Sequence, residues 1–138
     1  MKRFPITQEG FEKLSNELKQ LKTVERPAVI AAISEARDHG DLSENAEYQA
    51  AKEKQGFIEG RIIELEDKLA RSEVIDISKL SGDKVKFGAR VNLLDLNTNK
   101  KISCQIVGEY ESELADDKVS LNSPIARAMV GKNKGEII

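Results

Sequence analysis

The feature that most constrains the fold is the spacing of apolar residues between positions 11 and 69. These residues recur at steps of three and four on both sides of a short turn, which is the period of one face of an α-helix. The first run is Phe11, Leu14, Leu18, Leu21, Ile30, Ile33 and Ala36/Arg37, and the second is Ala50/Ala51, Lys54, Ile58, Ile62, Leu65 and Leu69. Two helices joined by so short a turn run antiparallel. The sequence therefore predicts a coiled-coil hairpin within residues 1–75.

Local signals mark the ends of these helices. Thr7 is a suitable N-cap for the first helix, and Pro27 interrupts that helix by kinking it or by starting a new segment. His39 and Gly40 indicate its end, because glycine readily takes the left-handed conformation of a C-terminal cap. Arms of about 30 residues would be about 45 Å long.

From Val74 onward the pattern changes to alternation with period two. The runs KVKFGARVNLLDL and KISCQIVGEY predict two strands, joined as a hairpin by the turn NTNKK. SPIARAMVGK predicts a short helix with Ser123 as its cap, Pro124 in its first turn and Gly131 at its stop. The final EII should begin a further strand. We therefore predict an α+β chain with a helical hairpin in 1–75 and a small β-rich domain in 76–138.

Composition limits the class of protein. The formal net charge is −2 and 33% of the residues are charged, so any contact with nucleic acid must be local. Cys104 is alone, which excludes an internal disulfide, and the first residues lack the apolar core of a signal peptide. No stretch is apolar enough to span a membrane, so a cytoplasmic protein without membrane contact is expected. We also expect a monomer.

Four acidic residues gather where the hairpin turns: Asp38, Asp41, Glu44 and Glu47. Helix capping explains part of the cluster, because Asp41 and Glu44 have the spacing of a capping box and acids in a first turn suit the helix dipole. Asp38 does not fit this reading, since it would lie in the last turn of the first helix.

The alternative is that Asp41 and Glu44 are presented as metal ligands. Mg²⁺ prefers about six oxygen ligands, and two carboxylates on a narrow hairpin end cannot enclose it. Such acids would need a partner that supplies the other ligands and the substrate. Phosphodiester cleavage with two metal ions is a suitable chemistry, because one carboxylate can recruit the second ion while another places the attacking water.

The chain resembles the bacterial transcript-cleavage factors of the Gre family. The resemblance rests on HGDLSENAEYQAAKEKQGFIEGRI, on NSPIARAMVGK and on the opening ITQEGFEKLSNEL, and it covers essentially the whole chain. It implies an N-terminal coiled coil that enters the secondary channel of bacterial RNA polymerase and an FKBP-like C-terminal domain that docks at the rim of that channel. Asp41 would help to hold a Mg²⁺ shared with the polymerase, and Glu44 would help to position the water that hydrolyses backtracked RNA. No cofactor is expected to bind tightly to the chain alone.

The resemblance also suggests roles for neighbouring residues. Arg37 and Lys52 would form a basic patch that contacts the 3′ end of the backtracked RNA, although both also suit a solvated helix surface. Asn45 would hydrogen-bond across the turn and Tyr48 would pack across the hairpin, both as supports. His39, without a second histidine or cysteine nearby, suits a helix end better than a zinc site.

In the second domain, a strand position without catalytic partners indicates a core role for Cys104. Ser123, Pro124 and Ile125 are candidates for docking on the polymerase, and they are equally explained as a helix start. Because few aromatic residues are available for an apolar proline pocket, docking is favoured over prolyl isomerase activity. Members of the family continue with more strand where this sequence stops, so the C-terminal sheet is expected to lack one or more strands.

These observations favour a transcription elongation factor that rescues arrested polymerase and is not an enzyme by itself. Three alternatives remain open at this stage. The chain could be a channel-binding inhibitor or regulator of polymerase with the same architecture, or a structural coiled-coil adaptor whose acids only cap helices. A free-standing metal nuclease is disfavoured by its sparse ligands.

Overall fold

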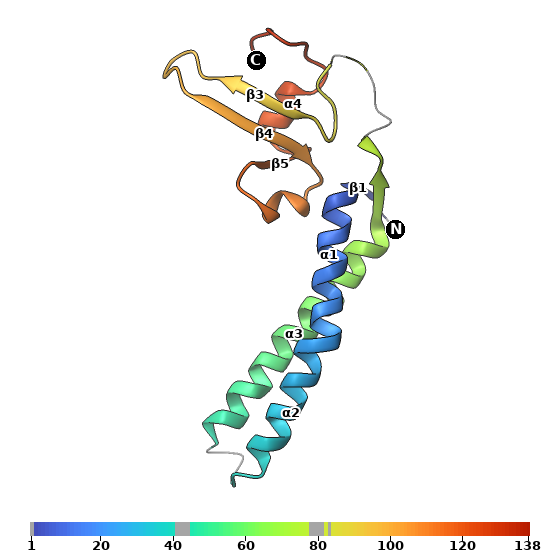
Figure 1. Ribbon diagram of the computed structural model, residues 1–138, viewed down its shortest axis with the longest axis vertical. Coiled ribbons are helices and arrows are strands. Elements are labelled where there is room, and N and C mark those ends of the chain that lie inside the picture. The colour runs from blue at the N-terminus through green and yellow to red at the C-terminus, as the bar shows by residue number, and fades with distance from the viewer. Residues whose placement is uncertain (1, 41–44, 78–81, 83) are drawn as a thin grey trace. The chain divides into compact units, whose positions relative to one another are not determined.

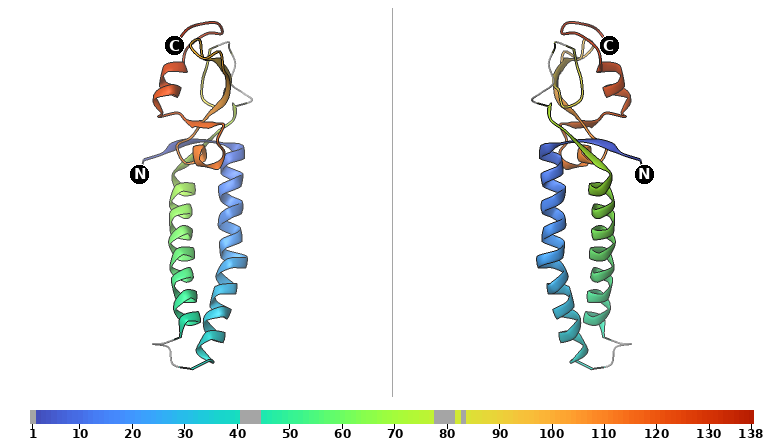
Figure 2. Two further views of the ribbon diagram at one scale, coloured as in Figure 1. Left: turned by 90° about the vertical axis from the view of Figure 1, so that its left-hand side faces the viewer. Right: turned by 90° about the vertical axis from the view of Figure 1, so that its right-hand side faces the viewer.

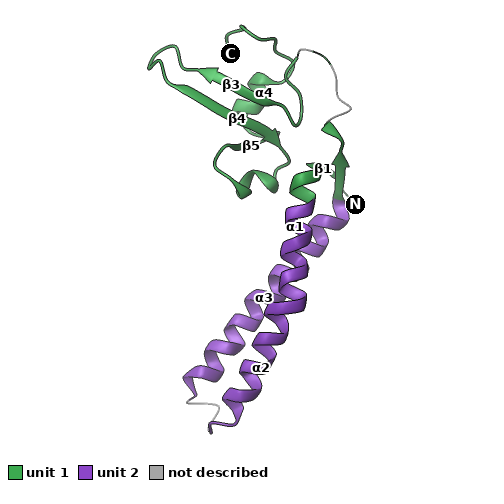
Figure 3. Ribbon diagram, in the orientation of Figure 1, with its two compact units in different colours: residues 1–11, 72–138 green, residues 12–71 purple. Residues whose placement is uncertain are grey.

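The computed structural model describes residues 2–40, 45–77, 82 and 84–138 (Figure 1). The chain forms two compact units, one of residues 12–71 and the other of residues 1–11 together with 72–138 (Figure 3). This division differs from the predicted one at residue 75. The reason is that β1 (Phe4–Thr7) pairs in parallel with β2 (Ser72–Ile75), which brings the first residues of the chain into the C-terminal unit.

The helical hairpin is confirmed. Its first arm consists of α1 (Gln8–Gln20), a π-helical turn (Leu21–Glu25) and α2 (Arg26–Arg37). Its second arm is α3 (Ala46–Arg71), which runs back beside the first arm (Figure 2). The predicted start of α1 is also confirmed, because the hydroxyl of Thr7 accepts a hydrogen bond of 3.0 Å from the backbone N–H of Gly10.

The π-helical turn explains how the first arm passes Pro27. A proline inside an α-helix clashes with the carbonyl four residues back. Here the N–H of Arg26 donates to the carbonyl of Leu21, five residues back, and α2 starts with Pro27 in its first turn. Such wider turns absorb an irregularity without ending the helix. Of the two alternatives predicted for Pro27, a kink or a new segment, the structure shows a new segment, α2, which follows the π-helical turn directly.

The apolar seam lies between the arms, with two corrections. Val29, Ile58 and Ile62 form its buried cluster, against which Leu18 and Leu21 pack. Further buried members of the seam are Leu14, Ile33, Ala36 and Leu65. Ile30 is half-exposed, since after the π-helical turn the preceding residue Val29 faces the other arm. The predicted seam position of Lys54 is wrong as well, because its side chain is 64% exposed and its ammonium lies 4.0 Å from Glu25.

Charged pairs link the two arms beside the seam. Both nitrogens of the Arg61 fork donate to Glu17, at 2.6 and 2.9 Å, and those of Arg26 donate to Glu59, at 2.7 and 2.8 Å. The bond from Arg26 lowers the pKa of the Glu59 carboxyl, and the bond to Glu17 raises the pKa of Arg61. Exposed pairs add little stability, but bidentate geometry specifies which residues face each other.

The C-terminal unit contains the predicted β-hairpin. β3 (Arg90–Leu94) pairs antiparallel with β4 (Lys101–Val107), and the Asp95 carboxylate accepts from the N–H of Asn97 at 2.9 Å in the turn between them. β5 (Lys118–Ser120) pairs in parallel with β4 and completes a three-stranded sheet of order β3-β4-β5. β5 was missed from the sequence because it is only three residues long.

The short helix α4 (Pro124–Met129) covers the core of this sheet. As predicted, the Ser123 side chain caps it by accepting from the N–H of Ala126, and Gly131 beyond its end has a φ of +86°. Cys104 is buried in the core with Ile106, Ala126 and Met129, which confirms its predicted core position. Burial raises the pKa of its thiol.

The predicted strand at Glu136–Ile138 is wrong. These residues form no ladder with any described strand, and a β-strand exists only where its backbone pairs with a neighbour. Among the helices that the structure describes, none combines the length and apolar character needed to cross a membrane.

Candidate functional site

The acidic cluster lies at the end of the hairpin where α2 gives way to α3. Asp41 and Glu44, the two acids predicted to act in catalysis, lie outside the described residues. Asp38 is the C-cap of α2, and its backbone N–H donates to the carbonyls of Glu35 and Ala36. Gly40 has a φ of +124°, which confirms the predicted end of the first arm.

Asn45 joins the two arms at this end. Its side-chain oxygen accepts from the N–H of Tyr48 at 3.0 Å, which is the geometry of an N-cap, and α3 begins at the next residue, Ala46. Its side-chain nitrogen donates to the carbonyl of Ala36 at 2.6 Å, near the end of α2. The amide thus satisfies a donor at the start of one helix and an acceptor at the end of the other.

The cap position corrects the capping hypothesis for Asp41. That hypothesis makes Asp41 the N-cap of the second helix, whereas α3 begins five residues later and Asn45 caps it. An acid in the first turn of α3 is indeed present, and it is the exposed Glu47. The cap of α3 therefore does not account for the presence of Asp41 and Glu44 in the sequence.

Arg37 and Tyr48 meet across the hairpin. The guanidinium carbon of Arg37 lies 6.0 Å from the centre of the Tyr48 ring, which is at the outer limit of a cation–π contact. Tyr48 is half-buried at the start of α3, while Arg37 is the last residue of α2. The ring and the cation add a second link between the arms, one helical turn from the Asn45 cap.

The two predicted basic residues are brought together. Arg37 and Lys52 line one hollow of about 250 Å³, whose other walls are Ile30, Ile33, Ser34 and Gln55. The Lys52 ammonium donates to the side-chain oxygen of Gln55 at 3.3 Å. Because both side chains are exposed, the hollow offers two cations to a ligand on one side of the hairpin.

His39 is exposed in the turn after α2. Within the ranges 2–40, 45–77 and 84–138, no group of three or more His, Cys, Asp or Glu side chains is arranged to hold a metal ion. That finding does not cover Asp41 and Glu44. Carboxylate oxygens are the ligands that Mg²⁺ prefers, so these two residues are a suitable but incomplete donor set for that ion.

The predicted docking residues lie at the start of α4. The Ser123 side chain caps the helix by accepting from the N–H of Ala126, whereas Pro124 is exposed and Ile125 is 40% exposed. The structure is compatible both with a helix start and with a docking surface in this segment. Ser123 caps the helix, while the side chains of Pro124 and Ile125 lie at the surface.

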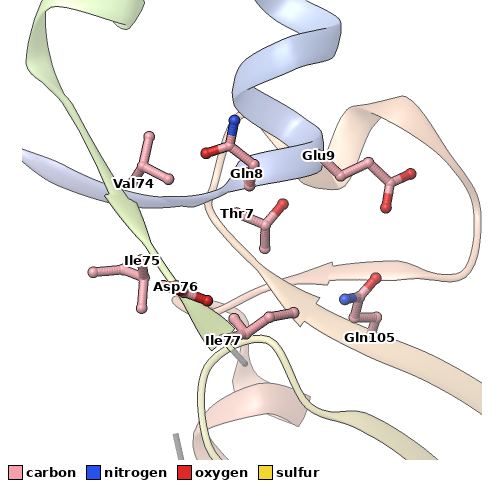
Figure 4. A pocket seen from close by; sticks show the side chains of 8 residues that line it. All are labelled: Thr7, Gln8, Glu9, Val74, Ile75, Asp76, Ile77 and Gln105. Carbon is pink, nitrogen blue, oxygen red and sulfur yellow. The ribbon is translucent and has the colours of Figure 1, made fainter. Parts of the chain in front are cut away.

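The C-terminal unit also contains a pocket of about 300 Å³ where β1 leads into α1 (Figure 4). Its lining is Thr7, Gln8, Glu9, Val74, Ile75, Asp76, Ile77 and Gln105. The two acids in this lining, Glu9 and Asp76, are engaged in interactions of their own. None of the lining residues is aromatic.

The chain belongs to the class of proteins that combine a coiled-coil hairpin with a small β-rich unit. The hairpin carries polar groups at its end, and the β-rich unit contains one short α-helix. Comparison with known proteins identifies the family. A family model described as the N-terminal domain of transcription elongation factors GreA and GreB matches residues 4–74, and the model of their C-terminal domain matches residues 80–138. The chain belongs to the GreA/GreB family of transcription elongation factors.

Individual relatives agree with this assignment. The transcription elongation factor GreA of Phenylobacterium zucineum is 62% identical over 138 residues, which are 100% of this chain and 88% of that protein. GreA of Maricaulis maris is 63% identical over 137 residues, covering 99% and 87%. The solved structure of Gfh1 from Thermus aquaticus is 28% identical with a TM-score of 0.51, covering 99% of this chain and 87% of that one.

Proposed function

We propose that this transcription elongation factor inserts its hairpin into the secondary channel of bacterial RNA polymerase and stimulates Mg²⁺-dependent cleavage of backtracked RNA. The observation that carries the proposal is the cap of α3. Because Asn45 provides that cap, the acids of the preceding GDLSE segment are not needed for it. Carboxylates that this cap does not use are candidates for metal ligands.

Asp41 and Glu44 would act only together with the polymerase. Asp41 would contribute a carboxylate to a Mg²⁺ that is otherwise held by the polymerase, and this ion would stabilise charge on the reacting phosphate. Glu44 would orient the water that attacks the phosphodiester. On this proposal the chain is not an independent nuclease, and it acts in the cytoplasm, where the polymerase is.

Arg37 and Lys52 would hold the RNA. A backtracked 3′ end carries phosphates, and two exposed cations that share a hollow supply a local attraction that the overall charge of −2 does not. Tyr48 and Asn45 would act one step away from the RNA, by holding the two arms and the Arg37 side chain in place. Ser123, Pro124 and Ile125 would contribute to docking at the channel rim.

The test uses stalled elongation complexes with RNA labelled at its 5′ end. The factor is expected to shorten the labelled RNA in the presence of Mg²⁺ and polymerase, and to leave the same RNA intact when polymerase is omitted. Slower transcription without RNA shortening would instead identify an inhibitor of the same architecture. Cleavage without polymerase would contradict the shared site and identify a nuclease.

A further inference from the structure

Glu111 is a buried carboxylate that the proposed reaction does not use. It begins a short 3-10 helix (Glu111–Leu114) and is 1% exposed. One carboxylate oxygen accepts from the N–H of Thr7 at 2.7 Å and from the N–H of Gly108 at 2.9 Å. The other accepts from the hydroxyl of Thr7 at 2.5 Å. Burying a charge is costly unless it is well hydrogen-bonded, and these three bonds supply that compensation.

The partner of Glu111 is the N-cap of α1. The hydroxyl of Thr7 donates to Glu111 and accepts from the N–H of Gly10, so the carboxylate and the cap form one chain of hydrogen bonds. A negative charge at the start of a helix is favoured by the helix dipole. We call Glu111, Thr7, Gly10 and Gly108 the Glu111 clasp.

Two glycines make room for the clasp. A Cβ atom on Gly10 would lie 2.1 Å from Oε2 of Glu111, and one on Gly108 would lie 2.3 Å from the carbonyl oxygen of Pro5. Real Cβ atoms do not approach other atoms this closely, so any larger residue would push the segments apart. The clasp therefore depends on close contact between the start of α1 and the loop after β4.

The Glu111 clasp holds the first turn of α1, the helix that begins the first arm of the hairpin. Figure 4 shows Thr7 where β1 leads into α1, and α1 continues from residues 8–11 of the C-terminal unit into the helical unit without a break. An α-helix transmits the orientation of its first turn along its length. The hydrogen bonds of Glu111 hold that first turn within the C-terminal unit.

We propose that Glu111 is a positioning residue for stimulated cleavage, because it holds the first turn of α1 and so determines how the docked factor presents the end of its hairpin to the polymerase. This inference rests on the proposed function. Glu111 itself touches no substrate. Its replacement by glutamine removes the charge and leaves one oxygen for the N–H groups of Thr7 and Gly108, while an NH₂ donor replaces the oxygen that accepts from the Thr7 hydroxyl. This exchange should weaken the hold on the first turn of α1.

The first test needs no polymerase. Spin labels at His39→Cys and Asn97→Cys, both at exposed positions, report the distance distribution between the hairpin end and the β3–β4 turn. Glu111→Gln and Thr7→Val are expected to broaden this distribution relative to the unsubstituted protein. Thr7→Ser, which keeps the hydroxyl, and Glu113→Gln, an exposed neighbour on the same short helix, are expected to leave it unchanged. Equal distributions in all five proteins would overturn the proposal.

The second test separates positioning from docking and from stability. At saturating factor and below the unfolding temperature of each variant, Glu111→Gln and Thr7→Val should lower the rate of stimulated cleavage about ten-fold or more. The concentration for half-maximal stimulation should not change, because the docking segment at α4 is intact. Full cleavage rates in both variants would overturn the proposal, as would losses that only follow the fraction unfolded. If the unsubstituted factor stimulates no cleavage, the proposed function fails, and the distance measurement still decides whether Glu111 holds the hairpin.

Discussion

The two arms of the hairpin begin with different kinds of cap. At the start of α1, Thr7 is buried and is bonded to the fully buried carboxylate of Glu111. At the start of α3, Asn45 is half-buried, and within the described part of the chain its side chain bonds to backbone groups of Tyr48 and Ala36. The first cap is surrounded by protein, and a Cβ on Gly10 would collide with the Glu111 carboxylate. Beside the second cap, Ala46 and Glu47 are exposed. The two caps therefore differ in burial and in the kind of group that they bond.

The largest effect is expected from filling the space in the clasp. Gly10→Ala would put a Cβ atom 2.1 Å from Oε2 of Glu111 and should destabilise the protein by about 1–3 kcal/mol. Gly60→Ala is the matched control, because nothing lies within 4 Å of its Cβ and alanine favours a helix interior by about 0.5–1 kcal/mol. Chemical unfolding measures both. Equal stability of Gly10→Ala and the unsubstituted protein would show that the clasp is not tightly closed.

A smaller effect is expected at the exposed cap. Asn45→Ala removes both hydrogen bonds and should lower the free energy of unfolding by about 1–2 kcal/mol. Asn45→Asp keeps the cap of α3 but loses the donor to the carbonyl of Ala36, so it should lower the free energy of unfolding less than Asn45→Ala does. Urea unfolding followed by helical circular dichroism gives the free energies, and amide exchange at Tyr48 reports the cap. If Asn45→Ala lowered the free energy of unfolding more than Gly10→Ala does, the proposed difference between the two caps would be wrong.

Changes in the basic hollow should affect function more than stability. Replacing Arg37 or Lys52 by glutamine is expected to reduce stimulated cleavage several-fold and to weaken its dependence on salt, because each cation removed is one fewer phosphate contact. Lys54→Gln is the control, since Lys54 is exposed but lies outside the hollow. Cleavage rates between about 50 and 200 mM salt are the measurement. Equal losses for all three variants would indicate a general charge effect.

The smallest effect is expected from the partly exposed pair of Arg26 and Glu59. Arg26 lowers the pKa of Glu59 in the folded protein, so the folded state binds its proton less readily than the unfolded state. The pair therefore stabilises the protein above the ordinary glutamate pKa of about 4.3, and this contribution is lost as the pH falls through the lower folded pKa. Unfolding between about pH 3 and 6 should show a slightly weaker pH dependence in Arg26→Gln. An unchanged profile would mean that the pair is open in solution.

Local sequence patterns predicted much of the fold. The apolar period identified both arms, and Pro27 and Gly40 marked a break and an end. The turn predicted in NTNKK does join β3 and β4, and the predicted helix start at Ser123-Pro124 is correct. The errors came from information that a local pattern does not contain. The π-helical turn changed which residue, Val29 or Ile30, faces the second arm, and the pairing of β1 with β2 joins segments far apart in the sequence.

The site was predicted less completely than the fold. Asp41 and Asn45 are both good capping residues, so sequence alone could not decide which one begins α3. Glu111 gave no signal, because its partner Thr7 is 104 residues away and an acid in a loop normally indicates exposure. The roles of Asp41 and Glu44, and the docking role of Ser123–Ile125, stay predictions.

The most direct test of the central claim is the rate of RNA cleavage in stalled elongation complexes with Asp41→Asn. Asparagine is a much poorer ligand for Mg²⁺ than aspartate, and the cap of α3 belongs to Asn45, so the variant should fold normally. Asp38→Asn, at the C-cap of α2, is the matched control with the same change of charge. The account predicts that Asp41→Asn abolishes stimulated cleavage while Asp38→Asn retains it. Cleavage at the parental rate with Asp41→Asn would contradict the account.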